Sequence, residues 1–132
     1  MNKTYTAACR CGGITVCCEG EPVRVSVCHC HACQQRSGSP FGEQARWPTE
    51  QVTISGEDRE WVRVSDAGNP VHYHFCPTCG TTVWYQGGPM PDAIAVPVGL
   101  FTDASFPPPR FSVWEARKHP WVTIAGEVEH YD

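Results

Sequence analysis

The sequence has 132 residues, a formal net charge of −4 and nine cysteines. An odd number of cysteines excludes a scaffold in which every cysteine is paired within the chain, and the negative charge argues against the basic face that nucleic-acid binding requires. With 41% hydrophobic and 18% charged residues, and no apolar run near the roughly 18 residues of a membrane span, the composition is that of a globular chain. We expect a single domain over residues 1–132, with no nucleic-acid or membrane partner.

The predicted elements are short strands separated by turns. In chain order, polar–apolar alternation or β-branched and aromatic composition predicts strands at 24–27, 51–54, 60–64, 71–75, 81–85, 93–98, 112–114 and 121–124. Only residues 32–37 are suited to a helix, and this helix is one short turn. Glycine and proline clusters mark the turns between these segments. The sequence therefore predicts a mainly β fold.

The first residues of the chain are informative about the cellular compartment of the protein. The first six residues carry one positive charge and no apolar segment, so no secretory signal is visible. We therefore expect a cytoplasmic, reducing location. In such an environment clustered cysteines bind metal or take part in chemistry more often than they form disulfides.

Seven of the nine cysteines lie in three closely spaced clusters. These are Cys9 and Cys11 (C-x-C), then Cys28, Cys30 and Cys33 (C-x-C-x-x-C), and finally Cys76 and Cys79 (C-x-x-C). Because a tight turn directs two nearby sulfurs the same way, the members of one cluster can converge on a single cation. Zinc suits thiolate ligands and tetrahedral geometry, so zinc is the predicted ion.

The cluster sizes predict two zinc sites with different functions. The two pairs (Cys9, Cys11, Cys76 and Cys79) complete a closed four-cysteine site, which is the arrangement of structural zinc. The cluster of Cys28, Cys30 and Cys33, called the triple below, leaves one coordination position open, which is the arrangement of catalytic zinc. Cys28, Cys30 and Cys33 are therefore the predicted catalytic ligands. The second metal site is expected to be partly occupied in a purified sample, since an open site loses its metal more readily.

Histidines beside the triple leave its ligand count open. His29 or His31 could supply a fourth ligand and make this site structural too. Strand alternation directs the side chain of His29 away from those of Cys28 and Cys30, which disfavours His29.

The remaining cysteines, Cys17 and Cys18, belong to no cluster. On a strand their side chains point to opposite faces, so one of them is expected in the core. A thioredoxin-type redox function for Cys76 and Cys79 is disfavoured because no βαβ pattern surrounds them. Redox sensing through Cys17, Cys18 or the triple stays open as an alternative.

The clusters lie within longer motifs that occur in a fixed order. These are residues 9–13 (CRCGG), 28–38 (CHCHACQQRSG), 74–81 (HFCPTCGT), 98–101 (VGLF) and 118–121 (KHPW). Over nearly its whole length the chain resembles the glutathione-dependent formaldehyde-activating enzyme family, which also includes centromere protein V.

The resemblance implies a fold, a zinc arrangement and a reaction class. The implied fold is a β-tent of small antiparallel sheets stapled by zinc, with the same division of cysteines that the spacing predicts. The implied activity is a carbon–sulfur lyase reaction run in reverse, the condensation of formaldehyde with glutathione to S-hydroxymethylglutathione. Relatives often carry a histidine before the late tryptophan, and residues 110–114 here (RFSVW) contain none.

The negative charge of the implied thiol substrate predicts which residues contact it. Glutathione carries two carboxylates, so we predict Arg36 and Arg46 as contacts, with Arg117 and Lys118 as further candidates. Candidates for the apolar walls of the site are Trp47, Trp114 and Trp121, and candidates for proton transfer are His29, His31 and His119.

Three thiolates on one dication leave a net charge of −1, which favours capture of a fourth thiolate over generation of hydroxide.

A different class of function remains possible on the sequence alone. The alternative is a zinc-stabilised binding module without catalysis.

Overall fold

The computed structural model describes residues 3–132 as a mainly β structure. A three-stranded sheet has the order β1 (Thr4–Ala8), β2 (Thr15–Glu19), β5 (Val52–Ser55). An eight-stranded sheet has the order β11 (Glu129–His130), β10 (Phe111–Val113), β3 (Arg24–Cys28), β4 (Gly42–Pro48), β9 (Met90–Pro97), β8 (Thr82–Gly87), β7 (Pro70–Phe75), β6 (Arg59–Val64). The strand pairs are antiparallel, except that β10 runs parallel to both of its neighbours.

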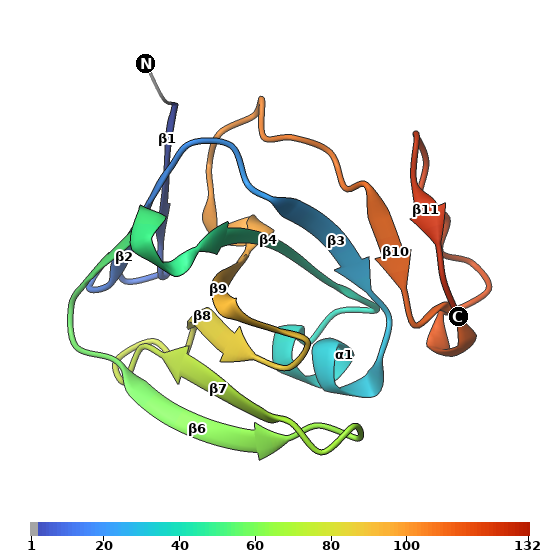
Figure 1. Ribbon diagram of the computed structural model, residues 1–132. Helices are drawn as coiled ribbons and strands as arrows, with labels where there is room; N and C mark the ends of the chain where they lie inside the picture. The colour runs from blue at the N-terminus through green and yellow to red at the C-terminus, as the bar shows by residue number, and fades with distance from the viewer. Residues whose placement is uncertain (1–2) are drawn as a thin grey trace.

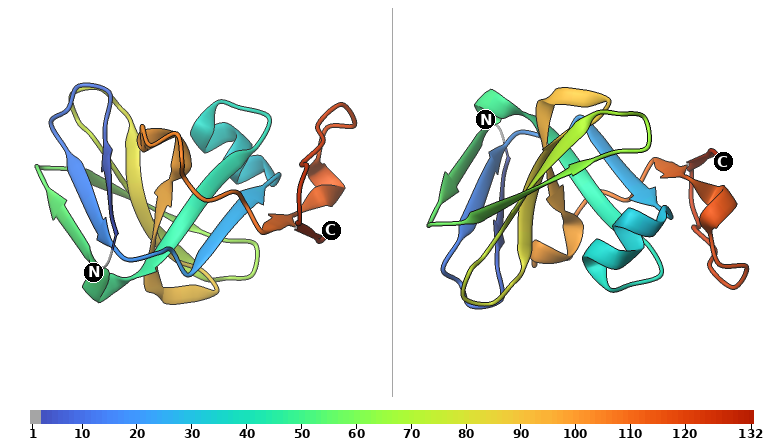
Figure 2. Two further views of the ribbon diagram at one scale, coloured as in Figure 1. Left: turned by 90° about the horizontal axis from the view of Figure 1, so that it is seen from above. Right: turned by 90° about the horizontal axis from the view of Figure 1, so that it is seen from below.

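One α-helix and three short 3₁₀ turns complete the described chain. Helix α1 covers His31–Ser37, and the 3₁₀ turns cover Thr49–Gln51, Val98–Leu100 and Glu115–Arg117. The large sheet curves, and α1 lies on its inner side (Figure 1). The three-stranded sheet and the C-terminal segment lie at opposite ends of the molecule (Figure 2). Within residues 3–132 no helix is long and apolar enough to cross a membrane.

Most of the predicted elements are confirmed, with boundaries shifted by a few residues. The strand predicted at 121–124 is wrong, because these residues form a turn and extended chain. The physical reason is that β10 is already paired with β3 on one side and β11 on the other, so residues 121–124 cannot pair with it. The predicted ranges omitted β1, β2, β4 and β11, and of these β4 matters most because it lies in the middle of the large sheet.

The core lies between the two sheets and is built by alternation along the strands. On β4, Ala45 and Trp47 are fully buried in the core, while Gln44 and Arg46 point to the opposite, inner face of the large sheet. The Nε1 of Trp47 donates a hydrogen bond to the carbonyl of Gly20 at 2.9 Å, so the only polar group of the buried indole has a hydrogen-bond partner. Trp47 is therefore a core residue and not a wall of the site, which corrects the sequence expectation.

Replacing this indole tests the core. Trp47→Ala is expected to lower the free energy of unfolding by about 3–5 kcal/mol, because the substitution removes a fully buried aromatic side chain and leaves a cavity. Urea denaturation of the metal-loaded protein measures the change. Trp61→Ala is the matched control, because the Trp61 side chain is 59% exposed. An equal loss of stability in both variants would contradict this description of the core.

Candidate metal centres and the adjoining pocket

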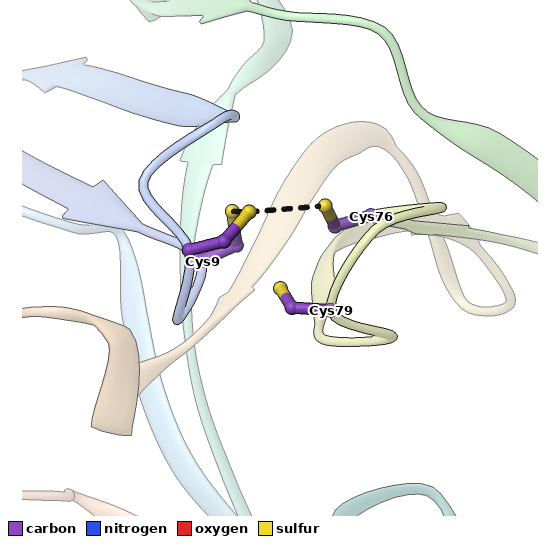
Figure 3. A group of neighbouring side chains, drawn as sticks. Cys9, Cys76 and Cys79 are labelled. Atoms are coloured by element: carbon purple, nitrogen blue, oxygen red, sulfur yellow. Dashed lines mark hydrogen bonds between the residues drawn. The ribbon is translucent and has the colours of Figure 1, made fainter.

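Four cysteine side chains from two distant loops meet at one end of the core. Cys9 and Cys11 lie in the turn between β1 and β2, and Cys76 and Cys79 lie in the turn between β7 and β8. Their sulfurs all lie within 4.8 Å of one another. Figure 3 shows the sulfurs of Cys9, Cys76 and Cys79 turned toward a shared space between the two loops.

Both loops are shaped by the local sequence to present their sulfurs. Gly12 and Gly80 each follow a cysteine and have φ of +79° and +77°, a left-handed conformation that favours glycine. The amide of Gly80 donates to the carbonyl of Cys76 at 2.8 Å, which closes a tight turn around the C-x-x-C segment. In the other loop the amide of Ile14 donates to Sγ of Cys9 at 3.3 Å. Amide donors directed at sulfur favour the thiolate form that binds metal.

The sulfur spacing fits a tetrahedral metal. The Cys9–Cys11 and Cys11–Cys76 Sγ distances are both 3.6 Å. Zinc–sulfur bonds of about 2.3 Å in a tetrahedron place sulfurs about 3.8 Å apart. Hydrogen bonds from the hydroxyl and amide of Thr81 lower the pKa of Cys79 to about 5, which favours its thiolate form. These four residues therefore fit a closed metal site that joins the small sheet to the large one.

The second cluster lies where β3 passes into α1. Cys28 ends β3, Cys30 is the N-cap of α1, and Cys33 is in the first helical turn. The Cys28 and Cys30 sulfurs are 3.3 Å apart, and all three sulfurs lie within 4.8 Å of one another. Sγ of Cys30 accepts a hydrogen bond from the Cys33 amide at 3.4 Å, as the oxygen of a serine or aspartate cap does in other helices.

This arrangement favours one thiolate within the triple. Hydrogen bonds from the thiols of Cys28 and Cys33 hold the pKa of Cys30 far below its usual range, and the amides at the helix start add to the effect. The donor thiol of Cys28 has a raised pKa for the same reason. Three converging sulfurs of this kind fit a metal ion that keeps one coordination position free, as the spacing predicted.

The three candidate histidines have different surroundings in the structure. His29 is fully buried, its Nε2 lies 2.9 Å from Oγ of Ser112, and burial lowers its pKa, which favours the neutral ring. His31 Nδ1 lies 3.0 Å from Nη1 of Arg117, which donates to it. His119 stacks on Trp121 with ring centroids 4.9 Å apart. Among residues 3–132 no hydrogen bond joins these imidazoles to a cysteine sulfur.

An open pocket lies beside helix α1, and its lining includes Ala32 and Arg36 but none of the three cysteines. It has a volume of about 440 Å³ and is lined by α1 and by strands β6, β7 and β8. Its aromatic walls are Trp61, Tyr73 and Phe75, none of which was among the residues predicted from the sequence. Trp61 and Tyr73 are cross-strand partners, so the alternation in 60–64 and 71–75 was the signal that could have found them. Of the three tryptophans predicted as walls, none lines this pocket.

The two arginines predicted to contact the thiol lie in different places. Arg36, on α1, lines the pocket. Arg46, on β4, faces the same side of the sheet, and its Nη1 donates to Oγ of Ser26 at 3.4 Å. The further candidate Lys118 donates a hydrogen bond from Nζ to the carbonyl of Val122 at 2.8 Å. This contact stabilises the C-terminal segment.

Cys17 and Cys18 lie apart from both clusters on β2. Cys18 is fully buried in the core and Cys17 is half-buried, as alternation predicted. Burial raises the pKa of Cys18 to about 12, so this thiol stays protonated.

Comparison with known proteins places this geometry in context. A crystal structure of a Rhodobacter sphaeroides protein superposes with a TM-score of 0.56 and 18% sequence identity, covering 75% of this chain and 89% of that one, so the two share a fold. A family model described as glutathione-dependent formaldehyde-activating enzyme matches residues 4–117, a range that includes both cysteine clusters. The chain therefore belongs to the glutathione-dependent formaldehyde-activating enzyme family.

Proposed function

We propose that this protein is a zinc-dependent enzyme of the carbon–sulfur lyase type that acts on a thiol such as glutathione and an aldehyde-derived adduct. The observation that carries the proposal is the convergence of the Cys28, Cys30 and Cys33 sulfurs at the start of helix α1, which also contributes Ala32 and Arg36 to an open pocket. Membership of the family supports glutathione and formaldehyde as the substrates. The proposed reaction is the formation, or in reverse the cleavage, of S-hydroxymethylglutathione.

The proposed division of the cysteines follows the two clusters. Cys9, Cys11, Cys76 and Cys79 would hold a structural zinc ion, and Cys28, Cys30 and Cys33 would hold the second. A zinc ion held by three thiolates supplies an open position at which a substrate thiol binds as its anion. Thiolate ligands must stay reduced, so we propose a cytoplasmic location for the protein.

The chain's own residues account for binding and orientation in this proposal. In the condensation, the thiol sulfur forms a bond to the carbonyl carbon of formaldehyde, and the proton lost from the thiol ends on the former carbonyl oxygen. In this proposal Trp61, Tyr73 and Phe75 supply apolar contacts to the substrate, and Arg36, which lines the same pocket, supplies a positive charge for a carboxylate of the thiol. His31, at the start of α1 and exposed, is the best placed of the three histidines to exchange a proton with solvent.

Metal analysis combined with thiol titration tests the proposal. Freshly purified protein is expected to contain one metal ion in the four-cysteine cluster and a second ion, at partial occupancy, in the three-cysteine cluster. In cobalt-substituted protein, adding glutathione should change the thiolate-to-metal absorption, whereas S-methylglutathione, which lacks a free thiol, should not. The protein should also accelerate exchange between formaldehyde, glutathione and their adduct, measured by NMR.

The Cys17→Ser variant is the control, because Cys17 lies outside both clusters. It should retain metal content, spectral response and exchange rate. Full metal content without a thiol-dependent spectrum or faster exchange would contradict the enzyme proposal and favour a binding module without catalysis.

A further inference from the structure

Strand β6 is an open edge of the large sheet and carries exposed apolar side chains. The sheet order ends at β6, so no strand of the described chain pairs with its outer edge, which forms the lower rim of the molecule in Figure 1. Trp61, Val62 and Val64 are 59%, 43% and 65% exposed. Lysine, proline and bulges commonly prevent an edge strand from pairing with another chain. β6 contains neither lysine nor proline and pairs with β7 without a bulge, so its free edge can accept a further strand.

The other sheet edges of residues 3–132 are less suited to pairing. On β1, Ala7 already forms a bridge to Phe101. β5 is four residues long, and its exposed side chains, Thr53 and Ser55, are polar. β11 has two residues. The edge that combines length with exposed apolar side chains is therefore β6.

The indole of Trp61 is held in place at this edge by its neighbours. Its ring lies 5.9 Å from that of Tyr73 on β7, and the Tyr73 ring lies 5.2 Å from that of Tyr85 on β8. The three rings form a row across the inner face of the sheet, and the row stops at the exposed indole. An aromatic side chain that is already ordered loses little conformational entropy when a partner covers it, which suits Trp61 to an interface.

The charges of β6 fit a second copy of the same strand, paired antiparallel about a two-fold axis. Such an axis keeps the inner faces of both sheets on one side, so opposed residues share an orientation. Two registers pair nearly the whole strand. In the register centred on Trp61, Arg59 lies opposite the partner's Arg63, and opposed like charges are destabilising. In the register centred on Val62, no like charges within β6 are directly opposed.

The inner face of the register centred on Val62 is complementary. Trp61 lies opposite the partner's Arg63, where the guanidinium can pack over the indole as a cation–π pair, and the two-fold axis repeats this contact. Trp61 and Arg63 both line the pocket beside α1. The partner copy therefore contributes a residue to the rim of the pocket.

The outer face of this register needs no new partner for a charge. Val62 meets its own copy at the axis, and Glu60 lies opposite the partner's Val64. The carboxylate of Glu60 already lies 3.3 Å from Nδ1 of His72 and 3.2 Å from Nε2 of His74. Its charge is thus balanced within its own protomer.

We propose that the protein forms a two-fold dimer in solution, in which β6 pairs antiparallel with β6 of a second copy, centred on Val62. The pairing joins the two large sheets into one and brings the two pockets next to each other. The proposal concerns assembly and does not depend on the proposed function.

Sedimentation velocity of the metal-loaded protein, from about 1 to about 300 µM, tests the dimer. This range is chosen because a strand pair is a small interface and small interfaces bind weakly. Val62→Lys should raise the dimer Kd by about 100-fold or more, because it opposes two ammonium groups at the axis. Val23→Lys is the matched control and should leave the Kd unchanged, because Val23 is 58% exposed and lies between β2 and β3. At about 1 µM this weak dimer is dissociated, so Trp61→Ala remains a valid control for the core.

Mixing two variants tests the register. Val62→Lys and Val62→Glu should each be monomeric alone, whereas an equal mixture should dimerise, because only the mixed dimer opposes a lysine to a glutamate. Recovery in the mixture also shows that both variants are folded. The proposal is overturned if wild-type protein stays monomeric up to about 300 µM, if Val62→Lys dimerises as wild type does, or if the mixture stays monomeric.

Discussion

Cys76→Ser is expected to leave the chain largely unfolded at 25 °C. The Cys76 side chain is only 2% exposed, and its sulfur lies 3.6 Å from that of Cys11 in the four-cysteine cluster. Structural zinc contributes about 10–16 kcal/mol to folding in zinc-finger peptides, whereas the whole stability of a domain is about 5–15 kcal/mol. Loss of this metal also releases the two loops that the cluster joins, one from the small sheet and one from the large sheet. Far-UV circular dichroism and thermal unfolding measure the effect.

Two comparisons identify the metal as the cause of the unfolding. Cys17→Ser makes the same chemical change at a half-buried cysteine outside both clusters, and it should fold normally. Chelation of wild-type protein should reproduce the Cys76→Ser result. A Cys76→Ser protein with wild-type melting temperature and spectrum would show that the four-cysteine cluster is not needed for folding.

Cys30→Ser is expected to abolish turnover while the fold and one metal ion per chain remain. A serine oxygen can still cap α1 by accepting from the amide of residue 33, so the local structure is retained. The oxygen is a poor substitute for a thiolate ligand of zinc. Since loss of an outer partner of a metal site costs about 10- to 100-fold in activity, loss of a direct ligand should lower kcat/KM by more than about 100-fold. Exchange between formaldehyde and glutathione, measured by NMR beside metal analysis, checks this.

The contrast between the two serine variants is the critical result. If Cys30→Ser unfolds as Cys76→Ser does, the three-cysteine cluster is structural too, and the catalytic assignment fails. If Cys30→Ser keeps both its metal ions and its activity, the triple does not bind the second ion. Cys17→Ser again supplies the matched control for the cysteine-to-serine change.

The strands and cysteine clusters were the most predictable features. β6 and β7 were predicted from polar–apolar alternation in their sequences, although β6 is almost wholly exposed and β7 is mostly half-buried. The cysteine spacing already separated a four-residue group from a three-residue group. The central strand β4 was missed because its inner face carries polar side chains, Gln44 and Arg46, and its sequence lacks an apolar pattern. A strand that borders a ligand site on one face and the core on the other gives a weak periodic signal.

The site around the cysteines was only partly predictable. Arg36 was one of several arginines that charge alone could nominate, and nothing local distinguished it from Arg46. Its position depends on Gly42, which comes next to it only when β4 packs beneath α1. The aromatic walls likewise depend on the pairing of Trp61 with Tyr73 across two strands.

By itself, the sequence determined the mainly β class, the short helix and which cysteines group together, because these follow from local alternation, turn residues and spacing. The tertiary structure decided that Trp47 is in the core and that Trp61, Tyr73 and Phe75 line one pocket together with Arg36. These latter features depend on contacts between residues far apart in the chain. Such contacts are set by strand order and register, which local patterns do not encode.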